Sequence, residues 1–291
     1  MILNSVGGSG IFPAAPETGS YKETTRISKG EVFVANFHLE IKTVSRGKGH
    51  SIAARINYIS GKKIHDIFLE KSHFYSRDDV LFCNVFRPAD APPEFADLQI
   101  LCDAINNAEK RYDARTAREF IGSLPNELSA SEEIKIVSEY IDHNFLSNGL
   151  CAVAAIHEGK NEADPSRNNP HVHILVSTRT IGPDGFDRRK DREHDKREYI
   201  NIWREQWALV QNRAYERNGL ELRVSHESLE VQGERDREPT PHLSLADYQR
   251  EKRGERTPAG DRKREIKARN EERTRRRQLE RERGLALERF R

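Results

Sequence analysis

The sequence predicts an α+β fold in which helices cover a mainly antiparallel central sheet. Short segments rich in β-branched and aromatic residues alternate with longer segments whose apolar residues recur every three or four positions. The first pattern is typical of strands and the second of amphipathic helices. The strand-like segments read as half-buried, which favours antiparallel pairing over a fully buried parallel sheet.

The first structured element is expected near residue 31. Residues 1–30 are rich in Gly, Ser, Thr and Pro and show no periodic pattern, so we expect a flexible arm there. Residues 32–44 are mostly β-branched and aromatic, and Phe37, Leu39 and Ile41 alternate with polar residues. This stretch therefore predicts a half-buried strand.

A helix is predicted after the basic loop at 45–50. Ser51 is a good N-cap residue, and apolar residues follow it at helical spacing as far as Ser60. Gly61 can adopt the left-handed conformation that often ends a helix.

The other elements follow from the same two patterns. We expect a strand at 80–86 among mixed short elements, a helix at 94–117, a strand at 118–124, a helix at 129–144, strands at 150–157 and 171–178, a charged loop at 182–198 and a helix at 201–218.

The small net charge of the chain hides two oppositely charged parts. The chain of 291 residues has 49 Lys and Arg against 47 Asp and Glu, a net charge of +2. Residues 251–291 hold 16 Lys and Arg against 9 Asp and Glu, a net charge of +7, so residues 1–250 carry −5. We expect an arm at 1–30, a main domain at 31–232, a linker with little structure at 233–259 and a basic helical or disordered tail at 260–291.

Composition excludes several classes of protein. No apolar run approaches the roughly 18–20 residues that a membrane helix needs, and the first residues lack a basic secretory n-region. Cys83, Cys102 and Cys151 are too few and too scattered for a disulfide framework or a zinc finger. We expect a cytosolic protein without membrane insertion, with these thiols acting as small core residues.

Three histidines form the most informative pattern. His171 and His173 stand two positions apart in a predicted strand, so both side chains project from one face. His157 ends the preceding strand, and a hairpin through 158–169 would bring it close to this pair. Three imidazoles can bind a divalent ion and leave coordination positions open for catalysis. The alternative is a strand-end histidine and two surface histidines.

Tyr58 is the candidate nucleophile. It borders the apolar stripe of the 51–60 helix, where a tyrosine is usually a rim residue with a solvated hydroxyl. Beside a metal site, a phenol oxygen can instead attack a phosphodiester and form a covalent phosphotyrosine.

Several motifs occur in an order that resembles the MobA/MobL group of plasmid relaxases, the DNA-nicking enzymes of conjugative mobilisation. They are Phe37-His38-Leu39, Ser45-Arg46-Gly47-Lys48-Gly49, the stretch 53–63, Ala91-Pro92-Pro93-Glu94-Phe95, Ala108-Glu109-Lys110, Ala117-Arg118-Glu119, Ala155-Ile156-His157, Asn169-Pro170-His171-Val172-His173, Trp207-Ala208 and Pro239-Thr240-Pro241-His242-Leu243. The resemblance covers roughly residues 33–245 and makes residues 31–232 a relaxase catalytic domain.

The resemblance implies a relaxase or rolling-circle endonuclease-like fold and a specific reaction. Tyr58 matches the nucleophile that cuts one strand at a transfer origin, leaving a 5′-phosphotyrosyl link and a free 3′-OH that can later be rejoined. His157, His171 and His173 match the ligands of Mg²⁺ or Mn²⁺.

Two acidic residues also match family positions. Asp66 follows the tyrosine helix, and Glu119 precedes Leu124-Pro125. Each can orient a histidine, accept the phenol proton or contact the metal. A surface ion pair is the alternative for both.

Basic residues beside the tyrosine helix and in the tail are candidate DNA contacts. Near the nucleophile these are Arg46, Lys48, Lys62 and Lys63, and in the tail they are Arg275, Arg276 and Arg277. Ordinary loop charges, and a solvated charged helix in the tail, are the alternatives.

The expected partners are single-stranded and origin-of-transfer DNA, relaxosome accessory proteins and a type IV secretion coupling protein in the bacterial cytoplasm. A rolling-circle replication initiator or a non-catalytic DNA-binding accessory protein are the alternative functions. A non-catalytic accessory protein would be expected to have lost the tyrosine or one of the histidines. The sequence retains the tyrosine and all three histidines.

Overall fold

The computed structural model describes residues 33–34, 37–160, 168–232, 238–241 and 243–288. The expected arm at 1–30 lies outside these residues. The strands are β1 (Phe33–Val34), β2 (Leu39–Ser45), β3 (Ile64–Asp66), β4 (Lys71–His73), β5 (Val80–Phe86), β6 (Arg115–Ser123), β7 (Leu150–His157), β8 (His171–Gly182), β9 (Gly185–Phe186) and β10 (Leu222–Arg223). The α-helices are α1 (Ile52–Ser60), α2 (Leu98–Ala108), α3 (Ala130–Asn144), α4 (Glu198–Arg217), α5 (Leu245–Lys252) and α6 (Pro258–Glu288), and the short 3₁₀ helices are η1 (Arg46–Lys48), η2 (Pro93–Ala96), η3 (Leu146–Asn148) and η5 (Glu193–Asp195).

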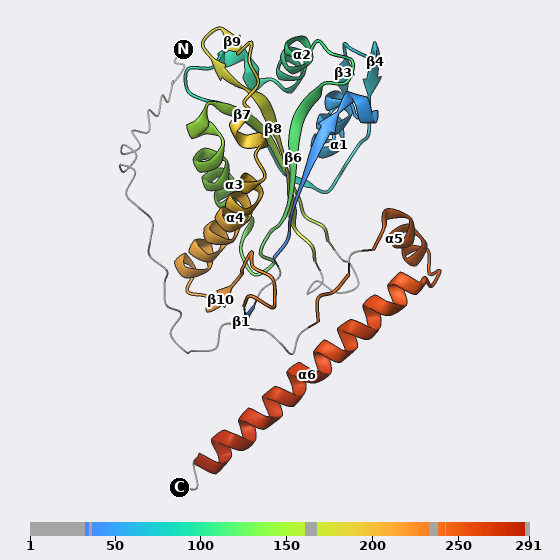
Figure 1. Cartoon of the computed structure of the whole chain (residues 1–291), viewed down its shortest axis with the longest axis vertical. Helices are drawn as coiled ribbons and strands as arrows, with labels where there is room; N and C mark the ends of the chain where they lie inside the picture. The colour runs from blue at the N-terminus through green and yellow to red at the C-terminus, as the bar shows by residue number, and fades with distance from the viewer. Residues whose placement is uncertain (1–32, 35–36, 161–167, 233–237, 242, 289–291) are drawn as a thin grey trace, which may run out of the picture. The chain divides into compact units, whose positions relative to one another are not determined.

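The central sheet has six strands and is antiparallel throughout. Its order is β2-β6-β8-β7-β5, and β9 pairs with β8 (Figure 1). The predicted α+β fold with a mainly antiparallel sheet is therefore confirmed. Two small pairs lie outside this sheet, the parallel pair β1–β10 and the antiparallel pair β3–β4.

The first hydrophobic core lies between the sheet and helices α3 and α4. Phe120 of β6 packs against Trp203 of α4, with ring centroids 4.9 Å apart, and Trp207 packs against Tyr140 of α3 at the same distance. Gly122 makes this packing possible, because a Cβ atom there would lie 2.7 Å from the Trp207 ring.

The second core lies on the opposite face of the sheet. Helix α1 contributes Ile56 and Ile59, and helix α2 contributes Leu101 and Cys102, all of them fully buried. Burial on both faces corrects the expectation of half-buried strands, since every residue of β7 is buried. Apolar–polar alternation underestimates burial when helices cover both sides of a sheet.

Three predicted boundaries are wrong for local reasons. The helix expected at 94–117 is η2 and α2, because Asp97 caps α2 by accepting from the backbone N–H groups of Gln99 and Ile100. The chain then turns, and β6 begins at Arg115. The single strand expected at 32–44 is β1 and β2. The loop expected at 182–198 contains β9 and η5.

The linker expected at 233–259 also contains regular structure. Helix α5 occupies part of it, with the Ser244 side chain accepting from the backbone N–H of Asp247 at 3.1 Å. The Glu251 carboxylate accepts from the backbone N–H and the hydroxyl of Thr257, where α6 is about to begin. Side-chain capping therefore orders a segment that has few apolar residues. The domain boundaries themselves stay predictions.

Two further expectations concern membranes and cysteines. Within the described part of the chain, no helix combines the length and the apolar character needed to cross a membrane. Cys102 and Cys151 are buried free thiols in the second core, as expected, whereas Cys83 is only partly buried.

Candidate active site

The pairing of β7 with β8 brings the three histidines together. His157 stands directly opposite His171 in this antiparallel register, and Ala155 stands opposite His173. The predicted hairpin arrangement is thus confirmed. Because Val172 and Ile174 point into the first core, His171 and His173 project from the opposite face, toward the α1 side.

The three imidazoles form a compact cluster. Ring centroids are 5.2 Å apart for His157 and His171, 4.9 Å for His157 and His173, and 5.3 Å for His171 and His173. One ring nitrogen from each residue lies within 4.8 Å of the other two. This spacing allows all three nitrogens to face a single ion.

Each ring is anchored through one nitrogen. His157 Nε2 lies 2.8 Å from the Ile59 carbonyl, His171 Nδ1 lies 2.8 Å from the Asn169 carbonyl, and His173 Nδ1 lies 3.1 Å from Glu119 Oε1. These acceptors require a proton on the anchored nitrogen, which leaves a lone pair on the other one. Outer hydrogen bonds of this kind set the tautomer and orientation of metal-binding histidines.

The cluster has the chemistry of a divalent metal site. His157 Nδ1 is buried and has no hydrogen-bond partner among the described residues, an arrangement that costs free energy unless something accepts its lone pair. Burial lowers the pKa of His157 to about 4 and also lowers the pKa of His171. Both rings are therefore neutral and able to bind a metal at physiological pH.

Helix α1 places Tyr58 beside this cluster. The Ser51 side chain caps the helix at the Ala54 N–H, and Gly61 ends it in the left-handed conformation with φ 67°, as predicted. The Tyr58 ring meets His173 edge-on, with centroids 5.9 Å apart, while 39% of the residue stays exposed. The candidate nucleophile is thus close to the histidine cluster, and part of its side chain is open to solvent.

Two arginines flank the Tyr58 ring. The guanidinium of Arg55 lies 5.1 Å from the ring centroid and that of Arg77 lies 4.8 Å from it. Arg77 is fixed by Asp79, to which it donates two hydrogen bonds of 2.7 and 2.6 Å. The hydrogen bonds with Asp79 are the main reason that the pKa of Arg77 is raised, and the Tyr58 hydroxyl adds to the effect.

Sequence reasoning missed both arginines. Arg55 precedes Tyr58 by three positions, so helical periodicity places the two side chains on one face and offered a signal. Arg77 lies between β4 and β5, in the stretch of mixed short elements, and carries no local pattern that singles it out.

Glu119 connects the tyrosine helix with the histidines. It is 3% exposed on β6, and its Oε1 atom accepts hydrogen bonds from both Arg55 and His173. Burial raises the pKa of Glu119, but the hydrogen bond from His173 and the charge of Arg55 outweigh it and lower the pKa overall. The carboxylate therefore stays charged and orients one side chain on each side of it.

A comparison with protein families identifies the chain. The model of the MobA/MobL family matches residues 50–253, which is more than half of the chain and includes Tyr58 and all three histidines. The chain belongs to the MobA/MobL family. The resemblance drawn from the sequence motifs is thereby confirmed.

Individual relatives agree with this MobA/MobL membership. The chain is 30% identical to the probable mobilization protein MobA of Bifidobacterium longum over 73% of its own length, and 29% identical to mobilization protein A of Escherichia coli over 78%. These matches span 44% and 32% of the respective relatives. A structure solved in work on the molecular basis of vancomycin resistance transfer in Staphylococcus aureus has 29% identity and a TM-score of 0.60. Its match covers 67% of this chain and all of that one.

In this MobA/MobL chain, Asp66 follows the tyrosine helix in the sequence, at the end of β3, but in space it contacts Ser51 at the start of that helix. It is 2% exposed and accepts hydrogen bonds from the Ser51 hydroxyl and from the backbone N–H groups of Phe68 and Leu69. Its described contacts include neither Tyr58 nor the three histidines. A catalytic role for Asp66 stays a prediction, while its contacts serve to hold the N-cap of α1.

The candidate DNA contacts near the nucleophile differ in availability. Arg46 donates to the carbonyls of Asn106, Glu109 and Arg111, and its guanidinium lies 3.9 Å from the centroid of the Phe68 ring. These contacts already use most of its donors. Lys48, Lys62 and Lys63 are exposed on the surface beside α1.

The tail candidates lie on α6. Arg275 is exposed, and Arg276 pairs with Glu280 at 3.1 Å. The side chain of Arg277 lies outside the described part of the structure. DNA binding by all seven candidates stays a prediction.

Proposed function

We propose that this chain is a conjugative relaxase domain that nicks one DNA strand at a plasmid transfer origin. The observation that carries the proposal is the edge contact between Tyr58 and His173, which sets an accessible phenol beside three convergent imidazole nitrogens. Membership of the MobA/MobL family and similarity to mobilization proteins support the same reaction and substrate.

Tyr58 acts as the nucleophile in a transesterification. Its oxygen attacks the scissile phosphorus, the P–O3′ bond breaks, and the departing 3′ oxygen takes up a proton to become a free hydroxyl. The 5′ phosphate remains esterified to Tyr58. One phosphodiester replaces another, so the reverse reaction rejoins the strand without an external energy source.

The positive charges around Tyr58 favour this chemistry. The guanidinium groups of Arg55 and Arg77 lie against its ring, where they can offset negative charge that develops on the scissile phosphate. Since Asp79 fixes the Arg77 guanidinium, the charge does not need to reorganise as the transition state forms. The phenol proton leaves to solvent from the exposed side of the ring. Glu119 serves as a positioning residue for Arg55 and His173.

His157, His171 and His173 would hold a divalent ion, whose chemistry is Lewis-acid polarisation of the scissile phosphate. An all-imidazole set is softer than the oxygen ligands that Mg²⁺ prefers. Of the two ions expected from the sequence, Mn²⁺ is therefore the better match.

A covalent-adduct assay tests the proposal. An oligonucleotide containing the plasmid's own transfer origin is incubated with the protein and Mn²⁺ and resolved on a denaturing protein gel. We expect a shifted adduct that is absent for Tyr58→Phe and after EDTA treatment. Tyr75→Phe is the matched control, because this exposed ring stacks on Tyr58 at 6.0 Å.

The outcomes separate the parts of the proposal. No wild-type adduct with any of several divalent ions refutes nicking by this domain. An adduct that persists in Tyr58→Phe but not in Tyr75→Phe assigns the nucleophile to Tyr75. Cleavage that survives His171→Ala refutes the metal assignment.

The biological setting of the proposal is the bacterial cytoplasm. There the domain would act on origin DNA together with relaxosome accessory proteins and a type IV secretion coupling protein. Co-purification of the tagged protein with these partners from a mobilising strain, compared with a strain that lacks the plasmid's other mobilisation genes, tests this part.

A further inference from the structure

Three rings stand in a row from the histidine cluster to the surface. Tyr58 meets His173 edge-on, with ring centroids 5.9 Å apart, and stacks on Tyr75, with centroids 6.0 Å apart and an angle of 26° between the ring planes. The exposed fraction rises along the row, from 5% for His173 to 39% for Tyr58 and 57% for Tyr75. Tyr75 is therefore the outermost ring, and the reaction proposed above gives it no role.

The segment that carries Tyr75 is held against helix α1. Its backbone approaches the end of the helix so closely that a Cβ atom at Gly61 would lie 3.3 Å from the backbone nitrogen of Arg77. The Arg77 side chain reaches the Tyr58 carbonyl at 3.4 Å and is fixed by Asp79. A ring two residues before such an anchor is already in place, which reduces the entropy lost when a ligand binds.

Cations surround this row of rings. The guanidinium groups of Arg55 and Arg77 lie 5.1 and 4.8 Å from the centroid of the Tyr58 ring. Lys62 and Lys63 are exposed directly after the tyrosine helix. Exposed rings interleaved with positive charge are what single-stranded nucleic acid needs, because the charges follow the phosphate backbone and the rings stack on the bases.

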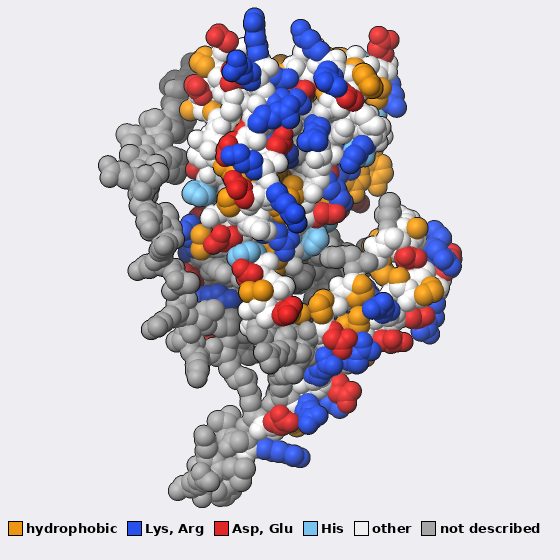
Figure 2. Space-filling view, in the orientation of Figure 1, with side chains coloured by type: hydrophobic (Ala, Val, Ile, Leu, Met, Phe, Trp, Pro, Cys, Tyr) orange, Lys and Arg blue, Asp and Glu red, His pale blue; other side chains and the backbone are white. Residues whose placement is uncertain are grey.

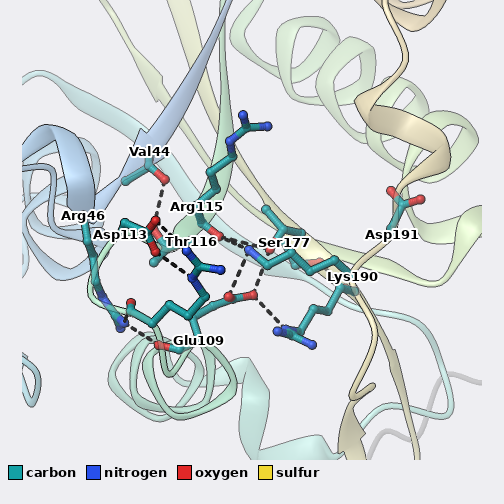
Figure 3. A network of polar contacts seen from close by, with 12 residues as sticks. Val44, Arg46, Glu109, Asp113, Arg115, Thr116, Ser177, Lys190 and Asp191 are labelled. Carbon is teal, nitrogen blue, oxygen red and sulfur yellow. Dashed lines mark hydrogen bonds and ion pairs between the residues drawn. The ribbon is translucent and has the colours of Figure 1, made fainter.

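The basic pocket at the other end of the central sheet is built differently. It has a volume of about 990 Å³ and is lined by eight Lys and Arg, and Figure 2 shows such side chains gathered over the upper part of the molecule, where Figure 1 places α2 and β9. On its floor is an ion network in which the Glu109 carboxylate accepts from Arg179 at 2.7 Å and from Lys190 at 2.9 Å (Figure 3). Phe186 is the only aromatic residue in the lining. The pocket thus offers charge but little ring surface, unlike the site around Tyr58.

The geometry of the reaction decides which base lies nearest to Tyr75. In phosphoryl transfer the attacking oxygen and the leaving oxygen lie roughly in line, on opposite sides of the phosphorus. The nucleotide that departs with the 3′ oxygen therefore points away from Tyr58. The nucleotide that keeps the phosphate through its 5′ oxygen stays attached to Tyr58, on the side where Tyr75 stacks.

We infer that Tyr75 stacks on the first base of the strand that becomes joined to Tyr58, the base directly 3′ of the nick. Only the identity of the ligand as DNA rests on the proposed function. Stacking holds this base before cleavage and keeps the covalently joined end in place afterwards, so that its phosphate stays aligned for rejoining. Tyr75 thus acts by binding the substrate and takes no part in bond breaking.

Equilibrium binding of single-stranded oligonucleotides tests the inference in a Tyr58→Phe background, which keeps the ring of residue 58 and forms no adduct. The fluorescent oligonucleotides contain the plasmid's own transfer origin. One is intact, and each of the others lacks a single base, at successive positions across the origin. The variants are Tyr75→Leu, which removes the ring but keeps apolar bulk, and Tyr75→Phe, which keeps the ring.

We expect Tyr75→Leu to bind the intact oligonucleotide roughly 5–100-fold more weakly, the range that corresponds to stacking of one base on an aromatic ring. Removal of the base directly 3′ of the nick should weaken binding by the parent protein by a similar factor. The same removal should have little further effect in Tyr75→Leu, because the ring and the base are the two halves of one contact. Tyr75→Phe should bind like the parent, since its missing hydroxyl has no hydrogen-bond partner among the described residues.

Phe74→Leu is the matched control. Phe74 is the neighbouring ring and is 71% exposed, and within the described part of the chain no ring contact joins it to Tyr58. This variant should keep the full sensitivity to removal of the base 3′ of the nick, whatever its overall affinity.

Several results overturn the inference. One is a Tyr75→Leu variant that binds the intact oligonucleotide like the parent, or that keeps the full sensitivity to removal of the 3′ base. Another is a dependence on Tyr75 that appears only for the base directly 5′ of the nick. Equal loss of sensitivity in Phe74→Leu, or a parent protein that binds none of the oligonucleotides, also overturns it.

Failure of the proposed function gives a different result. Absence of a covalent adduct with the wild-type protein refutes nicking, but the base-by-base pattern stays measurable because binding needs no cut. An adduct that forms while base removal has the same effect in Tyr75→Leu and in the parent refutes the stacking alone. Because Phe74 and Tyr75 are both exposed, the unfolding temperatures of their variants should match that of the parent, which excludes loss of folding as the cause.

Discussion

Replacing Glu119 with Gln tests how the site is held together. The substitution keeps the shape of the side chain and removes the charge that faces Arg55 and His173. The amide oxygen can still accept one hydrogen bond, while the new NH₂ group confronts a second donor. The variant should therefore fold but lose the orientation of one partner.

The expected loss of stability follows from how deeply Glu119 and its partner Arg55 are buried. A hydrogen bond to a charged group contributes about 1.5–3 kcal/mol, and the Arg55 side chain is 30% exposed, so water recovers part of the loss. We expect the free energy of unfolding to fall by about 1–2 kcal/mol. Metal affinity should fall roughly 10–100-fold, because Glu119 accepts the hydrogen bond from His173 Nδ1 that orients the ring.

The effect on stability should depend on pH. The folded-state pKa of Glu119 is lowered from 4.5, so its contribution is fully present above that value and is lost as pH falls through the folded pKa. The difference in unfolding free energy between wild type and Glu119→Gln should be full at neutral pH and shrink in acid. Urea unfolding at several pH values measures it, and isothermal titration with Mn²⁺ measures metal affinity.

A matched control is Glu139→Gln on α3, whose carboxylate pairs with Arg217 at the surface. An exposed pair contributes little, so we expect a change of no more than about 0.5 kcal/mol and unaltered metal binding. Equal metal affinity in wild type and in folded Glu119→Gln would refute the positioning role of Glu119.

Three further predictions, two of substitutions and one of pH dependence, test the rest of the structure. Gly122→Ala should lower the free energy of unfolding by about 1–3 kcal/mol, because the new Cβ would lie 2.7 Å from Trp207; an unchanged value by urea denaturation would contradict the packing. Glu109→Ala should cost about 3–5 kcal/mol in the same assay, since it leaves two cations that are 13% and 18% exposed without their partner; a loss below 1 kcal/mol would count against the network. Between pH 5 and 6, the logarithm of the Mn²⁺ affinity should fall by clearly fewer than three units per pH unit, because burial lowers the pKa of His157 to about 4 and also lowers the pKa of His171. A fall of three units per pH unit, measured by titration with Mn²⁺, would contradict these lowered pKa values.

Local signals predicted a large part of the site. The i, i+2 spacing of His171 and His173 requires one face in any strand, and strand order brought His157 to the same place. Ser51 and Gly61 marked both ends of the tyrosine helix, because caps satisfy backbone groups within a few residues. Such features need no information about the rest of the chain.

Errors arose where distant parts of the chain decide burial or order. The strands β7 and β8 are covered on both faces because α1 and α2 lie on one side and α3 and α4 on the other, which their own alternation does not reveal. The segment 245–252 was missed for a different, local reason, because it has little apolar content and its helix depends on the cap at Ser244, which directly precedes it.

By itself, the sequence determined the antiparallel α+β class, the three histidines and Tyr58, since each depends on periodicity or on motifs read along the chain. Only the tertiary structure decided which nitrogen of each histidine is free, that Arg77 lies against Tyr58, and that Glu119 joins the two halves of the site. It also gathered cations from the turn between α2 and β6, from β6, from β8 and from the segment after β9 around one pocket. Hydrogen bonds and charges act over a few ångströms in space, and folding alone sets which residues come within that range.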